Sequence, residues 1–485
     1  MSIAQKAARG AAWSVVTSLL SRGLGLAGTL ILMRFVVPAD YGEVSAAYVL
    51  VISANTFSTV GVGLYLIANP KAGRAVTFHA TVLHLLFGFT AIGGVWLLRE
   101  RFGPMFDAPD LGKFVPGFAL AAILERIAYV PERVLIRDLR FREISIMRTA
   151  GELTYTGVSL ALGVLGWGGM SIVMGTLARA LVKMVITLGL AHWREWAEPH
   201  KLDMKTLKTL TAYGLTVYAA GLANLASRRW DNLLVSRFFG PSTLGVYNLA
   251  YNLADVPAIN VGEQVTDVVM ASFAHLPPEK RREALVRTTG VLALVMFPLA
   301  VGLGAVAGTL TRTLLGESWK GVAPMLTLLA VLGVSRPIAG ALTAYLHASN
   351  RPRDVSFIEV SGAVVLLALI ATIGRTSPIA TCIAVGIAFT FKMLVAMFVV
   401  RRADGTPVWR FLGQLWAPLL ACVPMALAVV GVRHGLGSVG LSAGWAMLGV
   451  EIVVGAAAFV GAAFVVAPGP AREVVAIVRR RAGRA

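Results

Sequence analysis

The chain has 485 residues, of which 57% are hydrophobic and 14% are charged, and its formal net charge is +19. A soluble chain normally carries about a quarter charged residues, and the mean hydropathy of +0.74 is far above a soluble pattern. The composition therefore excludes an ordinary soluble enzyme. The placement of the positive charge decides whether it indicates nucleic-acid binding.

The apolar residues collect in runs of about twenty, long enough to cross a hydrocarbon core of ~30 Å. The first run is longer than a signal-peptide core, and no small-residue cleavage site follows it, so we expect it to be retained as a span. The sequence predicts an all-α integral membrane protein with about 14 transmembrane helices. They are expected at 10–33, 44–68, 78–98, 114–134, 146–166, 170–190, 210–235, 244–269, 288–310, 321–347, 355–373, 378–399, 411–432 and 441–466.

The basic residues lie unevenly between these spans. With the N-terminus in the cytoplasm, the inside segments hold about three times as many Lys and Arg as the outside loops, which is a positive-inside pattern. We therefore expect a bacterial inner-membrane protein with both termini cytoplasmic, and no nucleic-acid partner. The basic runs 133–148, 280–287 and 479–484 are placed to meet anionic lipid headgroups.

The longest loop, His192–Thr209, is expected on the cytoplasmic side. Trp193, Trp196, Leu202 and Leu207 lie there among lysines, a pattern that predicts an amphipathic interfacial helix. The expected organisation is an N-terminal lobe at 1–191, this linker at 192–209, a C-terminal lobe at 210–400, and two further spans with a basic tail at 401–485.

An internal repeat supports this division into lobes. Residues 33–50 (MRFVVPADYGEVSAAYVL) and 236–253 (SRFFGPSTLGVYNLAYNL) align without a gap. Each copy joins the first two spans of a six-span block and starts on the same side of the membrane. We therefore predict two six-helix lobes related by a pseudo-twofold axis along the membrane normal, plus two extra C-terminal helices. The identical pairs are Arg34/Arg237, Phe35/Phe238, Pro38/Pro241, Gly42/Gly245, Ala47/Ala250, Tyr48/Tyr251 and Leu50/Leu253.

Ionisable and amide groups inside spans are costly in a bilayer, so they are candidates for a wet interior. Arg22 lies near the middle of the first span, beside a stripe of serines and glycines that is explained by close helix packing. Arg22 itself is a site candidate, and so is Asn55 of span two. Arg126 in span four and Arg336 in span ten join them, with Glu125 as a neutralising partner for Arg126.

Spans seven and eight carry the densest polar faces. In span seven the spacing i, i+4, i+7 predicts that Asn224, Arg228 and Asp231 share one helix face, with Arg229 adjacent. A structural ion pair between Arg228 and Asp231 is the alternative reading. In span eight Asn248, Asn252 and Asp255 repeat that spacing, and either line a path or only pack. Arg179, Lys183 and Lys392 are expected to extend toward the cytoplasmic surface.

The expected interior is thus rich in arginine. Guanidinium groups form bidentate hydrogen bonds with phosphate, which predicts an anionic cargo. No phosphate-cradling loop and no His/Glu zinc spacing occurs in the sequence, and the two cysteines form no metal-ligand cluster. The chain is therefore not expected to be an enzyme or to hold a metal or cofactor.

The sequence resembles the Wzx-type flippases of polysaccharide repeat units, within the superfamily of multidrug, oligosaccharidyl-lipid and polysaccharide exporters. The resemblance rests on RFVVPADYG at 34–42 and on RRWDNLLVSRFFGPSTLGVYNLAYNLADVP at 228–257, which is typical of the exopolysaccharide and colanic-acid-like subgroup. The fourteen-span layout extends it over nearly the whole chain, although the last two spans match only in hydropathy. The positions that match the family pattern are Asp231, Asn232, Arg237, Gly240, Gly245, Tyr247 and Tyr251.

The resemblance implies transfer of undecaprenyl-pyrophosphate-linked oligosaccharide from the cytoplasmic to the periplasmic leaflet, for exopolysaccharide or O-antigen synthesis. It implies a cationic central cavity and coupling to membrane potential or to a proton or sodium gradient. A polysaccharide polymerase and a chain-length regulator are implied partners.

Two alternatives stay open at the level of sequence. A drug or cation antiporter of the same fold would need a mainly acidic interior. A membrane-embedded glycan polymerase or ligase would need an acidic catalytic pair, for which Asp107 and Asp110 are the only candidates.

Overall fold

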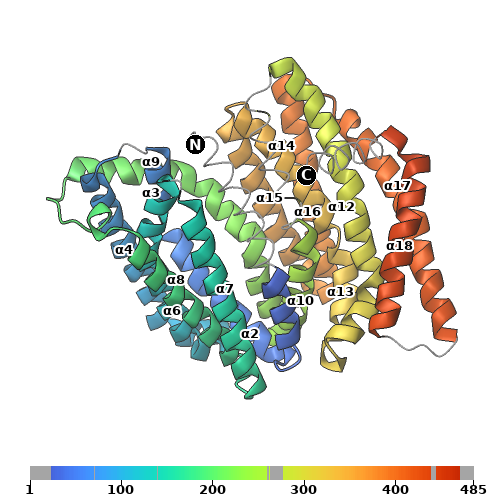
Figure 1. Ribbon diagram of the computed structural model, residues 1–485, viewed down its shortest axis with the longest axis horizontal. Helices are drawn as coiled ribbons and strands as arrows, with labels where there is room; N and C mark the ends of the chain where they lie inside the picture. The colour runs from blue at the N-terminus through green and yellow to red at the C-terminus, as the bar shows by residue number, and fades with distance from the viewer. Residues whose placement is uncertain are drawn as a thin grey trace. The chain divides into compact units, whose positions relative to one another are not determined.

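The computed structural model describes residues 23–59, 61–69, 72–138, 140–258, 262, 273, 277–438 and 444–469 (Figure 1). These residues form helices and no strands. A bilayer offers no water to backbone N–H and C=O groups, so helices that close their own hydrogen bonds are expected. In this described part, nine helices are long and apolar enough to cross a membrane. An all-α, multi-pass membrane protein is confirmed, and the number fourteen stays a prediction.

The chain divides into two compact units, and the first covers Met1–Gly245. A short apolar helix at Gly23–Leu32 opens its described part. The further helices are α2 (Pro38–Phe57), α3 (Val62–Ala68), α4 (Arg74–Leu97), α5 (Arg99–Met105), α6 (Leu111–Arg137), α7 (Phe141–Val164), α8 (Met170–Leu190), η1 (Trp193–Glu195), α9 (Met204–Leu225), η2 (Ala226–Trp230) and the first part of α10 (Asp231–Pro257).

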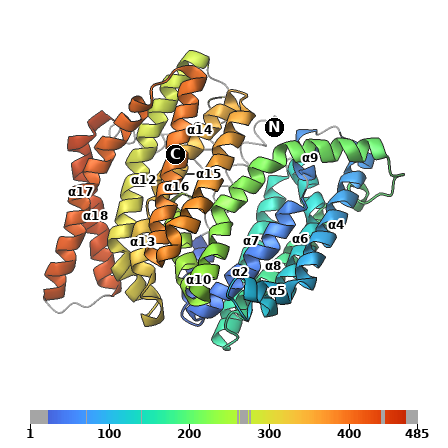
Figure 2. The same ribbon diagram turned by 180° about the vertical axis from the view of Figure 1, so that it is seen from behind.

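Within this unit α6 packs against α2, α4 and α8, and α7 pairs with α8. Figures 1 and 2 both show α7 and α8 as neighbouring helices. The turn between them contains Gly166 and Gly168, both with positive φ, and falls in the turn predicted at 166–169. Gly25 and Gly28 of the first helix lie against Glu152 and Thr156 of α7, as a small-residue packing face predicts.

The second unit covers Val246–Ala485. Its α17 and α18 pack against each other and against α12, while α16 packs against both α14 and α15. After the end of α10, its helices are α12 (Pro278–Leu314), η4 (Glu317–Trp319), α13 (Val322–Leu329), α14 (Leu332–Ala348), α15 (Pro352–Thr372), η5 (Gly374–Thr376), α16 (Pro378–Asp404), α17 (Val408–Ser438) and α18 (Trp445–Val466).

A buried carboxylate fastens the last two helices to α12. Glu451 of α18 is fully buried and accepts hydrogen bonds from Arg433 Nε of α17 and from Thr309 Oγ1 of α12, each at 2.9 Å. A buried charge is tolerated when it is paired and hydrogen-bonded. The helices that the sequence marked only by hydropathy are thus joined to this unit by a specific polar contact.

Two predicted spans are interrupted in the structure. Span two consists of α2 and α3, which end and begin at Phe57 and Val62, and span ten consists of α13 and α14. Helix α10 is also broken, at Gly240, which has φ 74° and separates two helical segments. This φ suits glycine because a side chain there would be strained, and the break coincides with the turn predicted between spans seven and eight.

The two copies of the repeat touch within the first unit. A Cβ atom on Gly42 would lie 1.8 Å from the carbonyl oxygen of Pro241, and one on Gly245 would lie 1.9 Å from that of Pro38. Only glycine permits so close a backbone approach. The reciprocity is what a local twofold relation between the copies produces, and the relation between whole lobes stays a prediction.

The loop after α8 differs from the predicted interfacial helix. Only Trp193–Glu195 form a short 3-10 turn, and α9 begins at Met204 with Asp203 as its N-cap. Thr81 donates to the carbonyl of Trp196 (2.9 Å), and His79 Nε2 accepts the backbone N–H of Asp203 (2.7 Å). The prediction of a continuous amphipathic helix is wrong because these contacts hold the loop against α4. Hydrogen bonds from Thr206 and Lys205 lower the pKa of the Asp203 carboxyl.

Candidate functional site

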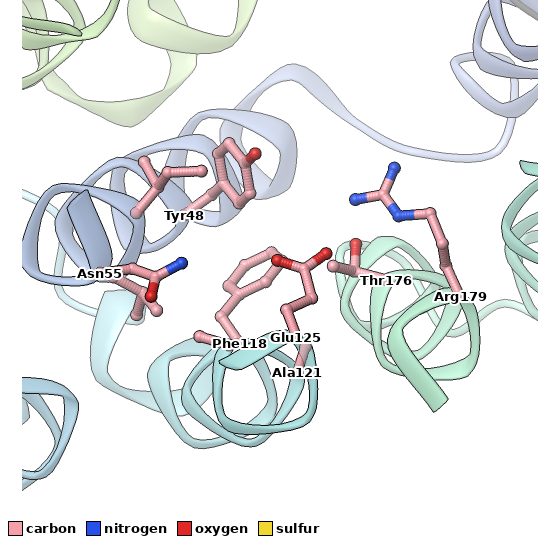
Figure 3. Close-up of a pocket in the computed structure, with 10 residues that line it drawn as sticks. Tyr48, Asn55, Phe118, Ala121, Glu125, Thr176 and Arg179 are labelled. Carbon is pink, nitrogen blue, oxygen red and sulfur yellow. The ribbon is translucent and has the colours of Figure 1, made fainter. Parts of the chain in front are cut away.

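A polar pocket lies between α2, α6 and α8 of the first unit (Figure 3). Its enclosed part has a volume of about 20 Å³, which is room for one water-sized group. The side chains that give it chemical character are Tyr48 and Asn55 from α2, Phe118 and Glu125 from α6, and Thr176 and Arg179 from α8.

Glu125 and Arg179 bring opposite charges to this pocket near the middle of their helices. Figure 3 shows the carboxylate of Glu125, the hydroxyl of Thr176 and the guanidinium of Arg179 directed toward the same space. Arg179 also lies 3.7 Å from Glu152 of α7 and 5.1 Å from the ring centroid of Tyr155. The prediction that Arg179 extends to the membrane surface is therefore wrong, because the Glu152 carboxylate and the Tyr155 ring hold it inside the unit.

Two aromatic rings form the apolar side of the pocket. Tyr48 and Phe118 pack edge to face with ring centroids 5.5 Å apart. The Arg229 guanidinium lies 5.9 Å from the centroid of the Tyr48 ring, within cation–π range. Arg229 was predicted as a cavity residue, and the structure brings it next to this pocket.

Arg126 is adjacent to Glu125 in sequence but points elsewhere. It is 1% exposed, and its Nε donates to Asn55 Oδ1 (2.6 Å) while its Nη1 donates to the carbonyls of His84 (2.8 Å) and Ser58 (3.3 Å). Its Nη2 donates to the carbonyl of Asn55 and the hydroxyl of Ser58. The last carbonyls of a helix lack intrahelical partners and carry partial negative charge, so a cation is favoured there.

The break after α2 thus explains why an arginine is buried at position 126, without any contact to a cargo. Its hydrogen bonds go to groups of the protein itself, so the geometry does not support the prediction that this guanidinium faces a wet cavity. The prediction that Glu125 neutralises it is also not supported, because Glu125 lines the pocket instead. Asn55 contributes both to the Arg126 contacts and to the pocket, since its Oδ1 accepts a hydrogen bond from Arg126 while its side chain lines the pocket.

The polar face predicted in span seven passes through a π-helical turn, η2. Asn224 precedes this turn, Arg228 lies in it, and Asp231, which is fully buried, follows it. A π turn adds a residue to the helical repeat, so the i, i+4, i+7 face is not straight. Trp230 fixes the turn on α2, because its Nε1 donates to Ser53 Oγ (3.0 Å).

The predicted polar residues of span eight and span ten lie in the second unit. Asn252 Nδ2 donates to Asn248 Oδ1 (3.2 Å), one helical turn away. Asp255 is buried and forms an ion pair with Arg336 of α14, whose guanidinium lies 5.4 Å from the ring centroid of Phe389. The structure therefore brings Asp255 and Arg336 together, whereas Arg22 lies outside the described residues.

Sequence reasoning missed two charge pairs between neighbouring helices. One is the Arg179 contact with Glu152, which is partly exposed, and the other joins Lys392 Nζ to Glu359 Oε2 at 2.7 Å between α16 and α15. Lys392 was expected to extend to the surface, but it is 9% exposed. The available signal was that each cation lies in a span whose neighbour along the chain carries an acidic residue, Glu152 or Glu359.

Solved membrane transporters share this fold. The lipid II flippase MurJ, in an inward closed conformation, matches with a TM-score of 0.74 over 93% of this chain and 98% of its own, at 13% identity. An inward-facing multidrug resistance MATE family transporter of the MOP superfamily matches with a TM-score of 0.63 over 79% and 94%, at 14% identity. The fold is therefore the one found in these transporters, and the apolar helices make the protein a multi-pass membrane protein.

Sequence comparison identifies the family. A family model described as "Polysaccharide biosynthesis protein" matches residues 31–324, and the chain belongs to this family. The lipopolysaccharide biosynthesis protein WzxC of Escherichia coli is 25% identical over 90% of this chain and 89% of its own length. The succinoglycan biosynthesis transport protein ExoT of Rhizobium meliloti is 24% identical over 88% and 86%. The resemblance to Wzx-type polysaccharide exporters is confirmed.

Proposed function

We propose that this protein is a flippase that carries undecaprenyl-pyrophosphate-linked oligosaccharide repeat units from the cytoplasmic to the periplasmic leaflet. The cargo serves exopolysaccharide or O-antigen synthesis, and the protein acts by alternating access without forming or breaking covalent bonds. The observation that carries this proposal is the family match, with two relatives named for polysaccharide biosynthesis or transport that align over most of their length.

The described interior is compatible with a cargo that has both charged and hydroxylated parts. The first unit places Glu125 and Arg179 in one pocket, with Arg229 over the Tyr48 ring beside it, and the second unit buries the Asp255–Arg336 pair. Charged groups are costly inside a membrane unless they are paired or serve a pathway. A mainly acidic interior, which the antiporter alternative requires, is not what these positions provide.

The pyrophosphate would require cations at mid-depth. Arg228, Arg229 and Arg336 are the candidates among described residues, and Arg22 joins them from the sequence alone. Guanidinium groups suit this role because they form paired hydrogen bonds with phosphate oxygens. Coupling to membrane potential or to a proton or sodium gradient would supply the driving force, and a polymerase with a chain-length regulator would take up the product.

A deletion strain tests the proposal. Loss of the gene should abolish the surface polysaccharide and cause lipid-linked repeat units to accumulate on the cytoplasmic leaflet, and the wild-type gene should reverse both effects. The measurement is the amount of surface polysaccharide together with the amount of extractable undecaprenyl-pyrophosphate oligosaccharide. Unchanged polysaccharide with no accumulated lipid would contradict the proposal.

A further inference from the structure

Several polar groups in the α2–α6–α8 pocket have no hydrogen-bond partner within the described part of the chain. They are the Tyr48 hydroxyl and the Glu125 carboxylate, and the Asn55 side-chain N–H₂ likewise donates to no described residue. The Arg179 guanidinium beside them is ion-paired with Glu152 at 3.7 Å. Polar groups inside a membrane protein normally find partners, because leaving them unpaired costs free energy. Donors and acceptors that converge on one pocket are therefore available to a ligand.

The charges around the pocket argue against a phosphate and against a simple cation. Glu125 and Glu152 place two carboxylates around the single guanidinium of Arg179, so a phosphate there would be repelled. A metal cation would meet the positive charge of Arg179 and, over the Tyr48 ring, that of Arg229. A neutral ligand with hydroxyl groups avoids both penalties, because each hydroxyl donates one hydrogen bond and accepts others.

The shape of the pocket fits the edge of such a ligand. The enclosed volume of about 20 Å³ holds one hydroxyl or hydroxymethyl group and not a whole ring. The Tyr48 and Phe118 rings lie 5.5 Å apart at its side and offer an apolar surface to the C–H groups of a sugar. Apolar walls with a few placed polar groups are typical of small-molecule sites.

We propose that this pocket binds one hydroxyl or hydroxymethyl group of a neutral sugar in the oligosaccharide cargo. The inference rests on the proposed flippase function and adds a glycan subsite to it. Glu125 accepts a hydrogen bond from this hydroxyl, while Arg179 and the Asn55 amide donate to its oxygen. The Tyr48 hydroxyl does either. The subsite contacts the glycan, and the pyrophosphate binds elsewhere.

Binding to two lipids tests this subsite. The full-length protein in lipid nanodiscs is titrated with undecaprenyl pyrophosphate, and separately with the undecaprenyl-pyrophosphate oligosaccharide extracted from the deletion strain. Tyr48→Phe and Glu125→Met each remove hydrogen-bonding atoms with little change of volume. We expect each to weaken binding of the glycosylated lipid about fivefold or more, and to leave binding of undecaprenyl pyrophosphate unchanged.

Matched controls separate a site from a general effect. Tyr65→Phe changes a tyrosine of α3 outside the pocket, and Glu100→Gln changes an exposed glutamate of α5, so both should bind the two lipids like wild type. Melting temperatures of Tyr48→Phe and Glu125→Met should equal that of wild type, because the altered atoms have no described hydrogen bonds.

Other outcomes overturn the subsite. Equal weakening for both lipids would show that the pocket binds the pyrophosphate or that the variants disturb the fold. Unchanged binding of both lipids would show that the glycan does not contact the pocket. A sodium-dependent melting temperature that disappears in Glu125→Met would indicate a cation site instead. If the wild-type protein binds neither lipid, the flippase proposal itself fails, and this result is distinct from failure of the subsite alone.

Discussion

Arg126 shows how one residue can satisfy the end of a broken helix inside a membrane. Its guanidinium donates to two carbonyl groups at the end of α2 and to the carbonyl of His84 in α4. Five fixed donors in a plane suit several acceptors at once, which the single ammonium of lysine does not. A positive charge in a dry interior is then offset by carbonyl dipoles, without a carboxylate.

We predict that Arg126→Ala and Arg126→Lys both destabilise the protein. Each leaves buried carbonyls without donors, and each such group costs about 1–3 kcal/mol. Thermal unfolding in detergent should therefore begin at a lower temperature for both variants. If Arg126→Lys melts like wild type but loses polysaccharide export, the residue contacts cargo and the structural role is wrong.

The Asp255–Arg336 pair allows a second test at this scale. Both side chains are about nine-tenths buried, and removing one member of a buried pair leaves an uncompensated charge that costs about 3–5 kcal/mol. Asp255→Asn and Arg336→Gln should each lower the melting temperature. The double variant should recover part of the loss, and strictly additive losses would show that the two groups do not interact.

At the scale of elements, the contact between the two repeat copies depends on the absence of side chains. Gly42 of α2 faces the backbone carbonyl of Pro241 in the other copy, and Gly245 of α10 faces that of Pro38. The carbonyl cannot rotate out of the way as a side chain would, so an added methyl group must move one helix. The glycine at the same position of both copies therefore has one structural reason, the close approach of the two backbones.

We predict that Gly42→Ala and Gly245→Ala each lower thermal stability and export, and to a similar extent, because the contact is reciprocal. Gly94→Ala in α4 is the control, since a Cβ there meets nothing within 4 Å. That change should be neutral or stabilising by about 0.5–1 kcal/mol, because alanine favours helix. Wild-type melting of the Gly42 and Gly245 variants would contradict the close approach.

Hydropathy predicted continuous elements well and their interruptions poorly. The spans expected at 114–134 and 170–190 correspond to α6 (Leu111–Arg137) and α8 (Met170–Leu190). The break after α2 could not be predicted from its own residues, because it is held by Arg126 of a distant helix. The linker was mispredicted for the same reason, since its hydrogen-bond partners lie on α4.

The candidate site was predictable only where spacing alone places residues together. The i, i+4 relation of Asn248 and Asn252 is present as a hydrogen bond. The pocket was not predicted, because Glu125, Arg179 and Tyr48 come from three helices and no local pattern joins them. Reading Arg179 by its distance from a helix end missed the neighbouring carboxylates.

For the whole molecule, the distribution of basic residues predicts one orientation in the membrane. Both termini and the loop at 192–209 should be cytoplasmic. Reporter fusions at Arg375 and Arg433 should give periplasmic activity, whereas fusions at Arg402 and at the C-terminus should give cytoplasmic activity. A periplasmic C-terminus would contradict the predicted fourteen spans.

We propose that this chain alone moves a glycosylated lipid across a bilayer. The most direct measurement uses purified protein in liposomes that contain undecaprenyl-pyrophosphate oligosaccharide, and follows how much of the glycan becomes accessible to a membrane-impermeant lectin or glycosidase. We expect accessibility to rise beyond the outer-leaflet fraction with wild-type protein and to stay at that fraction in protein-free liposomes. Equal accessibility in the two preparations, under an imposed proton or sodium gradient as well as without one, would contradict it.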